Sequence, residues 1–179
     1  AVLVREPNHV VANERVESIL EEMQDARGLA TFFVGRSRFL EAAKVYELLP
    51  GGFVERINSL ELALQSTPGS DEVFRALESI YRESESWQKL SDLLKGRLPF
   101  VKEPKATEAL QIQLSEIEAQ ALGEPKQAFR EMLEAFDAVR SAAIVERLVE
   151  LAIPLGESRA VYEEAGEYLA ELGRGQTLL

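Results

Sequence analysis

The chain contains no cysteine and only one histidine, His9. Without thiols it cannot form a disulfide, a thiolate metal site or a cysteine nucleophile. A single histidine also excludes a metal site built from several histidines, and we interpret His9 as a surface residue next to a helix cap. No phosphate-binding loop is present, because Gly51-Gly52 lacks the Lys-Ser/Thr that would follow it.

Blocks of basic residues and long apolar runs are also lacking. The net charge of −11 divides into −3 for residues 1–68, −4 for residues 69–140 and −4 for residues 141–179. Phosphate backbones and anionic membrane surfaces need clustered Lys and Arg, so nucleic acid and membrane binding are disfavoured. No run approaches the ~18 apolar residues of a membrane span. We expect a cytoplasmic protein, and we interpret the chain, which does not begin with Met, as part of a longer or processed one.

Acidic residues are abundant, but they form no recognisable catalytic or metal-binding motif. Adjacent and near-adjacent carboxylates, such as Glu21-Glu22, Glu116 with Glu118 and Glu163-Glu164, could in principle perform acid–base chemistry. On amphipathic helices such pairs usually lie on the solvated side, and we interpret them so. No calcium-binding loop with alternating Asp residues is present. The sequence therefore predicts no catalytic residues, no metal and no cofactor, and we expect that the chain is not an enzyme.

What the chain does contain is an internal repeat. The stretch PNHVVANERVESILEE, from Pro7, reappears as PGSDEVFRALESIYRE, from Pro68, and a third copy begins near residue 140. A self-match of this period is typical of stacked supersecondary units. We therefore predict a single repeat domain over 1–179, with copies near 7–67, 68–139 and 140–179, as a fragment of a longer array.

The first copy is about eleven residues shorter than the second, and the missing part corresponds to Leu98–Glu108. Three explanations are open: a deletion that fuses two helices near 26–49, a shortened second helix, or residues lost from the sequence.

Apolar residues recur at spacings of three and four almost throughout, which predicts an all-α fold of about ten helices. Short turns between them predict antiparallel hairpins. In the helix that begins at Trp87, we expect one buried stripe and one side that faces away. The stripe consists of Trp87, Leu90, Leu93, Leu94, Leu98 and Val101, and the outward residues are Gln88, Lys89, Ser91, Asp92 and Lys95. Plausible N-caps are Asn8, Ser70 or Asp71, Ser86 and Ser141. The predicted helices span 9–24, 26–35, 37–49, 53–66, 70–84, 86–98, 105–121, 125–138, 142–154 and 157–172.

Half of the longer period, about 36 residues, is close to the length of a tetratricopeptide hairpin. The segment FRALESIYRESESWQKLSDLL resembles such a hairpin, with large residues near the positions of the family pattern at Phe74, Leu77, Tyr81, Trp87 and Leu94. FVERINSLELALQSTP resembles a second helix with its closing proline, and LGEPKQAFREMLEAF supplies the turn glycine and small residues. Glu78 and Arg97 stand where the family has small residues, so the repeats are degenerate. The resemblance, closest in style to long bacterial arrays, implies a right-handed superhelix of hairpins, a tetratricopeptide-like α-solenoid.

In that family the first helix of each hairpin lines a concave groove that binds a peptide or helix of a partner protein. The resemblance implies a protein-binding scaffold, with a partner of mixed or basic character and possible self-association through the array ends. The alternatives are a structural spacer within a larger assembly, and a regulatory domain of an enzyme whose catalytic part lies outside this chain. Carried onto this chain, the groove consists of Glu14, Ser18, Glu21, Glu72, Arg75, Ser79, Arg82, Gln113, Ile117, Gln120, Glu146 and Glu150.

Overall fold

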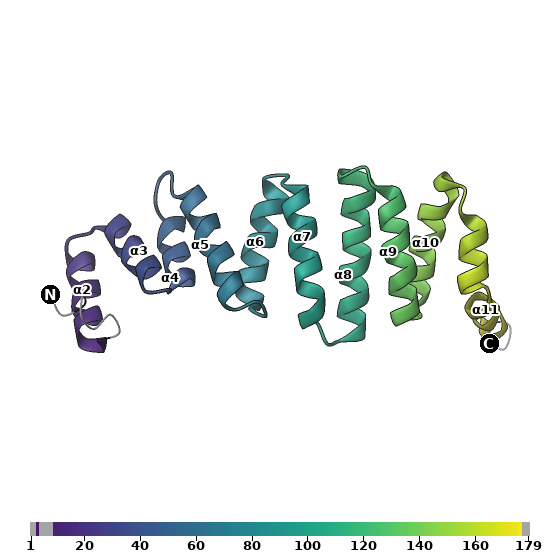
Figure 1. Ribbon diagram of the computed structural model, residues 1–179, viewed down its shortest axis with the longest axis horizontal. Coiled ribbons are helices and arrows are strands. Elements are labelled where there is room, and N and C mark those ends of the chain that lie inside the picture. Colours follow the sequence, from purple (N-terminus) through teal and green to yellow (C-terminus); the bar gives the residue numbers. More distant parts are fainter. Residues whose placement is uncertain (1–2, 4–8, 177–179) are drawn as a thin grey trace. The chain divides into compact units, whose positions relative to one another are not determined.

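The computed structural model describes residue 3 and residues 9–176, and over these residues the chain forms ten α-helices and no strand (Figure 1). The all-α prediction is confirmed. The helices are α2 (Val10–Glu22), α3 (Ala26–Gly35), α4 (Phe39–Glu47), α5 (Phe53–Ser66), α6 (Asp71–Glu83), α7 (Trp87–Arg97), α8 (Pro104–Glu116), α9 (Pro125–Ala138), α10 (Ala142–Leu155) and α11 (Ser158–Gln176).

Helix starts follow the capping residues of the sequence. The side chain of Ser70 accepts a hydrogen bond from the Val73 amide at 3.4 Å, and Ser141 accepts one from Ile144 at 3.2 Å. Ser70 rather than Asp71 is therefore the cap of α6. Ser86 precedes α7 without a side-chain capping bond. Asn8 lies outside the described residues, and His9 caps α2, with its Nδ1 3.3 Å from the Ala12 amide.

The cap at Ser141 gives a direct test of how α10 begins. Ser141→Ala removes the acceptor for an otherwise unpaired helix-start amide and should lower the free energy of unfolding by about 1 kcal/mol. Ser141→Asp keeps an acceptor and places a negative charge near the helix N-terminus, so it should stay near the wild-type value. Urea denaturation followed by circular dichroism measures both, and equal losses in the two variants would contradict the capping role.

Four separate helices make up the first repeat copy, α2–α5, and four make up the second, α6–α9. Three residues separate α3 from α4, so the explanation in which these helices fuse is wrong. The length difference lies within and between helices. The nine-residue α4 corresponds to the thirteen-residue α8 with a five-residue π-helical turn, Ile117–Ala121, behind it. A 3₁₀ turn, Leu98–Phe100, also lengthens the end of α7.

The chain divides into two compact units, Ala1–Ser84 and Glu85–Leu179, called here the N-terminal and C-terminal units. The division falls between α6 and α7, inside the hairpin with the strongest repeat signal. In the N-terminal unit each helix from α2 to α6 packs against the next one along the chain. Its core contains Ala30, Phe33, Ala42 and Tyr46, and the guanidinium of Arg38 lies 4.4 Å from the centre of the Phe33 ring.

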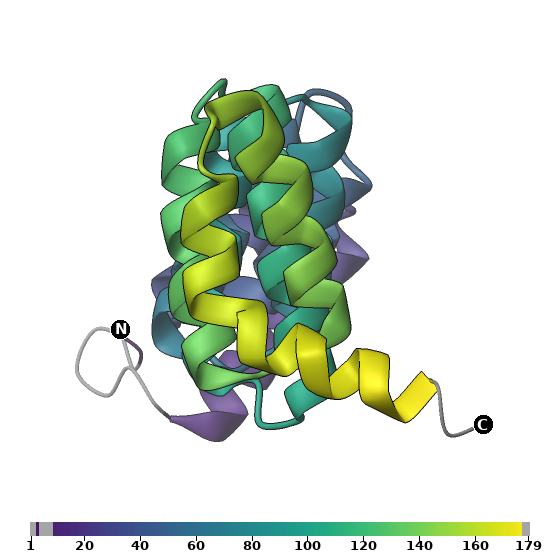
Figure 2. The same ribbon diagram turned by 90° about the vertical axis from the view of Figure 1, so that its right-hand side faces the viewer.

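In the C-terminal unit the same sequential packing runs from α7 to α11. Its core joins α9, α10 and α11, and the ring of Phe136 meets that of Tyr168 edge to face at 5.6 Å. Gly156 ends α10 in a left-handed conformation, with φ of 74°, which favours glycine at this turn. Beyond the turn α11 runs back beside α10, and its last part leaves the hairpin (Figure 2).

Candidate functional site

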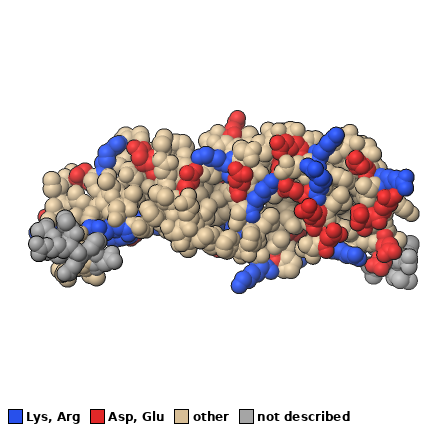
Figure 3. Space-filling view, viewed as in Figure 1, with Lys and Arg blue, Asp and Glu red and all other residues tan. Residues whose placement is uncertain are grey.

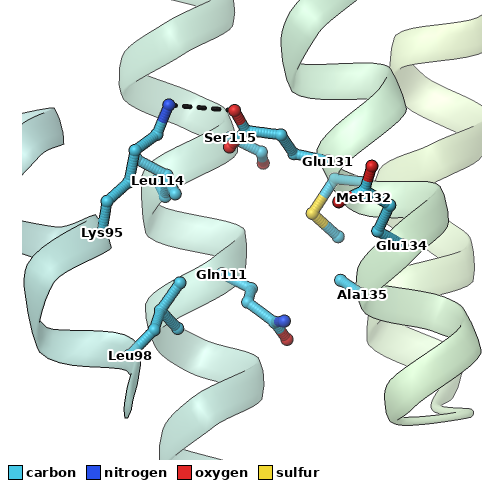
Figure 4. Close-up of a pocket in the computed structure, with 9 residues that line it drawn as sticks. All are labelled: Lys95, Leu98, Gln111, Leu114, Ser115, Glu131, Met132, Glu134 and Ala135. Carbon is cyan, nitrogen blue, oxygen red and sulfur yellow. Dashed lines mark hydrogen bonds and ion pairs between the residues drawn. The ribbon is translucent and has the colours of Figure 1, made fainter. Parts of the chain in front are cut away.

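A cavity of about 280 Å³ lies in the C-terminal unit between α7, α8 and α9 (Figure 4). The helices that form it follow one another in the chain, so the sequential packing of the repeat builds its walls. Leu98, Leu114, Met132 and Ala135 supply apolar surface. The polar residues of the wall are Lys95, Gln111, Ser115, Glu131 and Glu134.

One end of the cavity carries a charged cluster. The ammonium of Lys95 lies 2.6 Å from Oε1 of Glu118 and 2.9 Å from Oε1 of Glu131; Figure 4 marks the second contact. Glu118 is only 1% exposed, and Ser91 donates a long hydrogen bond of 3.5 Å to it. Gln127 donates to Glu131 at 2.9 Å. One lysine thus holds two carboxylates together, one of them fully buried.

Burial and pairing shift the proton affinities of this cluster. Burial raises the pKa of Glu118 above its usual 4.5, although Lys95 opposes the shift. Burial also raises the pKa of Glu131, but hydrogen bonds from Lys95 and Gln127 outweigh it, and the net shift is downward. Burial lowers the pKa of Lys95, but its two carboxylate partners outweigh this and hold it above 10.5. The cluster therefore favours a charged lysine between two unequal carboxyl groups.

Glu118 lies at the start of a π-helical turn, eight residues after Leu110 and four after Leu114 on the buried face of α8. The Leu122 amide donates to the carbonyl of Ile117 at 3.0 Å, five residues back, and the Glu124 amide donates to Glu118 O at 2.7 Å. The Ile117 amide donates to Gln113 O, four residues back, so α-helical spacing continues to this point. Glu118 therefore faces the core, and the interpretation of Glu116 and Glu118 as a solvated pair is wrong for Glu118.

Ser91 and Lys95 were expected to face away from the core, and this expectation is wrong for Ser91, which is buried. Both side chains point toward the π turn after α8, where Glu118 lies. A helix that packs against neighbours on two sides has two buried faces. The apolar stripe of α7 predicted only one of these buried faces. The signal for the second face was that Ser91 and Lys95 are four residues apart and so lie on the same side of the helix.

A second polar link joins α10 to α8. Arg147 donates from Nε to the Ser115 hydroxyl at 2.8 Å and from Nη2 to the Ser115 carbonyl at 3.2 Å. Its Nη1 donates to Glu150 at 2.9 Å. Arg147 is buried, so these bonds satisfy a charge that would otherwise be costly to enclose. They fix Ser115 at the cavity wall.

The predicted groove residues divide between the two units. In the N-terminal unit, Glu14, Ser18 and Glu21 lie on α2, and Glu72, Arg75, Ser79 and Arg82 lie on α6. In the C-terminal unit, Gln113 lies on α8, Ile117 and Gln120 on the π turn, and Glu146 and Glu150 on α10. All are exposed or half-buried except Ile117, which is only 6% exposed. Ile117 belongs to the core, because it follows Leu114 by three residues on the buried face of α8, and its place in a surface groove is a correction.

The exposed side of α6, defined by Glu72, Arg75, Ser79 and Arg82, carries the basic residues of the predicted groove. Glu72 pairs with Lys44 of α4 at 2.8 Å. Within α6, Arg82 pairs with Glu78 at 3.0 Å and Ser79 donates to Glu83 at 2.6 Å. The opposite side of the helix buries Val73, Leu77, Ile80 and Tyr81. These four residues fix the orientation of the exposed side.

Comparison with protein-family models and with curated proteins finds no match to the chain. The tetratricopeptide resemblance therefore stays a prediction. Within residues 9–176, no helix has both the length and the apolar character needed to cross a membrane. In the same part of the chain, no three His, Asp or Glu side chains converge as a metal site would require.

Proposed function

We propose that the chain is a protein-interaction module that binds a peptide or helix of a partner protein and has no catalytic activity of its own. In this proposal the hairpins stack as a tetratricopeptide-like solenoid, and the exposed side of α6 forms part of its binding surface. The observation that carries the proposal is that this side is polar and accessible, while the opposite side is anchored in the core. A rigid helix presents its side chains without a large ordering cost on binding.

Arg75 and Arg82 are the side chains that we expect to contribute most. Arginine is enriched among residues that dominate binding energy, because its planar group donates several hydrogen bonds at once. Lys44 already pairs with Glu72, so the carboxylate of Glu72 does not oppose an acidic group of the partner at full strength. A partner segment with an acidic residue opposite these arginines, within a sequence of mixed charge, fits this surface.

The proposal is tested by capturing partners from a cell lysate with the wild-type chain and with Arg75→Ala/Arg82→Ala. A purified partner should bind the double variant about 30- to 800-fold more weakly, if each arginine contributes roughly 1–2 kcal/mol. The matched control is Lys126→Ala/Arg130→Ala, which removes two exposed positive charges from α9. Equal binding by all three proteins would contradict the proposed surface, and a chain that captures no specific partner would favour the spacer alternative.

A further inference from the structure

The cavity between α7, α8 and α9 combines apolar walls with hydrogen-bond acceptors. The side chains of Leu98, Leu114 and Met132 form a surface suited to methylene groups. Glu131 and Glu134 place carboxylates on the α9 wall. The amide of Gln111 extends from α8 into the cavity (Figure 4). Such a surface suits a long side chain with a polar, hydrogen-donating end.

Gln111 supplies the most specific observation. Its Oε1 atom is buried and accepts no hydrogen bond in the described structure. A buried acceptor without a donor is unfavourable, and most such atoms in folded proteins are satisfied. The Gln111 side chain lines the cavity, so a rotation of its amide turns this oxygen toward a donor that enters. The cavity therefore suits a ligand that brings N–H groups.

The charges around the cavity determine whether it favours a positive or a negative ligand. The cavity lining carries one cation, Lys95, and two carboxylates, those of Glu131 and Glu134. Lys95 is paired with Glu131 and with the buried Glu118, so three carboxylates face this one cation. On the face shown in Figure 3, acidic side chains also gather over the C-terminal unit. This excess disfavours an anion and favours a positively charged ligand.

We propose that this cavity binds the cationic side chain of an arginine or lysine presented by the partner peptide, with the stem along Leu98, Leu114 and Met132 and the charged end at Gln111 and Glu134. The inference rests on the proposed function for the source of the ligand, because a peptide partner supplies the side chain. It implies that the partner peptide carries a basic residue that enters this cavity. The predicted groove did not include the cavity.

The chain contains only two methionines, which makes the cavity directly observable. Met132 lies in its wall at 1% exposure, whereas Met23 is 69% exposed and lies in the N-terminal unit. With ¹³C-methyl methionine, N-acetyl-arginine methylamide should shift the Met132 signal saturably and leave Met23 unchanged. The expected dissociation constant is on the order of 1 mM. The neutral isostere N-acetyl-citrulline methylamide should bind about tenfold more weakly, because it lacks the charge.

Variants then test the assigned contacts. Gln111→Leu and Glu134→Gln should each weaken arginine amide binding about fivefold, since each removes one acceptor or charge. Glu163→Gln, on α11 outside the cavity lining, is the matched control and should bind as the wild type does. A circular-dichroism spectrum and a thermal melt that match those of the wild type show that the fold of the free variants is intact. No Met132 shift at about 20 mM arginine amide, equal binding of the citrulline compound, or unchanged binding in both cavity variants would overturn the assignment.

Spermidine separates a peptide side chain from a free polyamine with similar chemistry. Weaker binding by spermidine than by arginine amide supports the assignment, and tighter binding by spermidine overturns it. The failure of this inference is distinguishable from the failure of the proposed function. If the cavity binds no cation while partner capture still depends on Arg75 and Arg82, only the cavity assignment is lost.

Discussion

Replacing Phe136 with alanine should lower the free energy of unfolding of the C-terminal unit by about 3–5 kcal/mol. The ring is buried among α9, α10 and α11 and meets Tyr168 edge to face. Its removal leaves a cavity at the point where three successive helices are joined. Urea denaturation followed by the fluorescence of Trp87, the only tryptophan and part of the C-terminal unit, measures the loss.

Phe100 provides the control for this prediction. It lies at the end of the 3₁₀ turn after α7 and is 45% exposed. Phe100→Ala should therefore cost no more than about 1 kcal/mol, because nearly half of the side chain's surface stays in water. Similar losses in the two variants would contradict the position of the core in this unit.

Replacing Lys95 with methionine should cost about 3 kcal/mol near pH 7. The change leaves the buried Glu118 facing Glu131 without the cation that compensates both. Breaking a buried pair typically costs 3–5 kcal/mol, and the lower end applies because the lysine side chain is partly exposed. Chemical denaturation of the variant at several pH values provides the measurement.

The pH dependence of the variant has a defined sign. With Lys95 absent, both carboxyl groups favour the neutral form, and protonation removes their repulsion. The loss should therefore be largest near neutral pH, should begin to shrink as the pH falls through the raised pKa values of these groups, and should be mostly gone near pH 4.5. In the wild type, acid has the opposite effect on stability. The lowered pKa of Glu131 stabilises the folded state above pH 4.5, and this stabilisation is lost on acidification.

A second substitution separates charge from packing. Glu118→Gln in the Lys95→Met background removes the buried charge but keeps a side chain of similar shape, so it should recover most of the lost stability. Lys126→Met, at an exposed position on α9, should change stability by less than about 0.5 kcal/mol. A Lys95→Met loss that neither acid nor Glu118→Gln reduces would show that the charges of the cluster do not determine its contribution.

Helix positions could be predicted because local signals determine them. The predicted ranges 53–66 and 125–138 agree with α5 and α9, and Ser70 and Ser141 cap the helices that they precede. Spacings of three and four reveal one apolar face of a helix, and a capping side chain is close in sequence to the amides it satisfies. Both signals act within a few residues, so no knowledge of distant contacts was needed.

The cavity and its cluster could not be predicted in the same way. The burial of Glu118 fits the spacing of Leu110 and Leu114, but its charge and the exposed acidic residue Glu116 beside it favour the opposite prediction. Gln111 and Glu134 belong to different helices, and their residue types are common on any helix surface. Their meeting in one cavity depends on how α8 packs against α9. Ile117 lies on the same buried face of α8 as Leu110 and Leu114, so their spacing was the signal that predicts its burial.

Site-specific photo-crosslinking tests most directly whether the exposed side of α6 is a binding surface. A photoreactive p-benzoylphenylalanine replaces Ser79 between the two arginines, and a second protein carries it at the exposed Lys102 as a control. Our account predicts that the residue at position 79 crosslinks to a short segment of one partner, that unmodified chain competes with this crosslink, and that position 102 gives none. Crosslinks to that partner from position 102 but not from position 79 would contradict it.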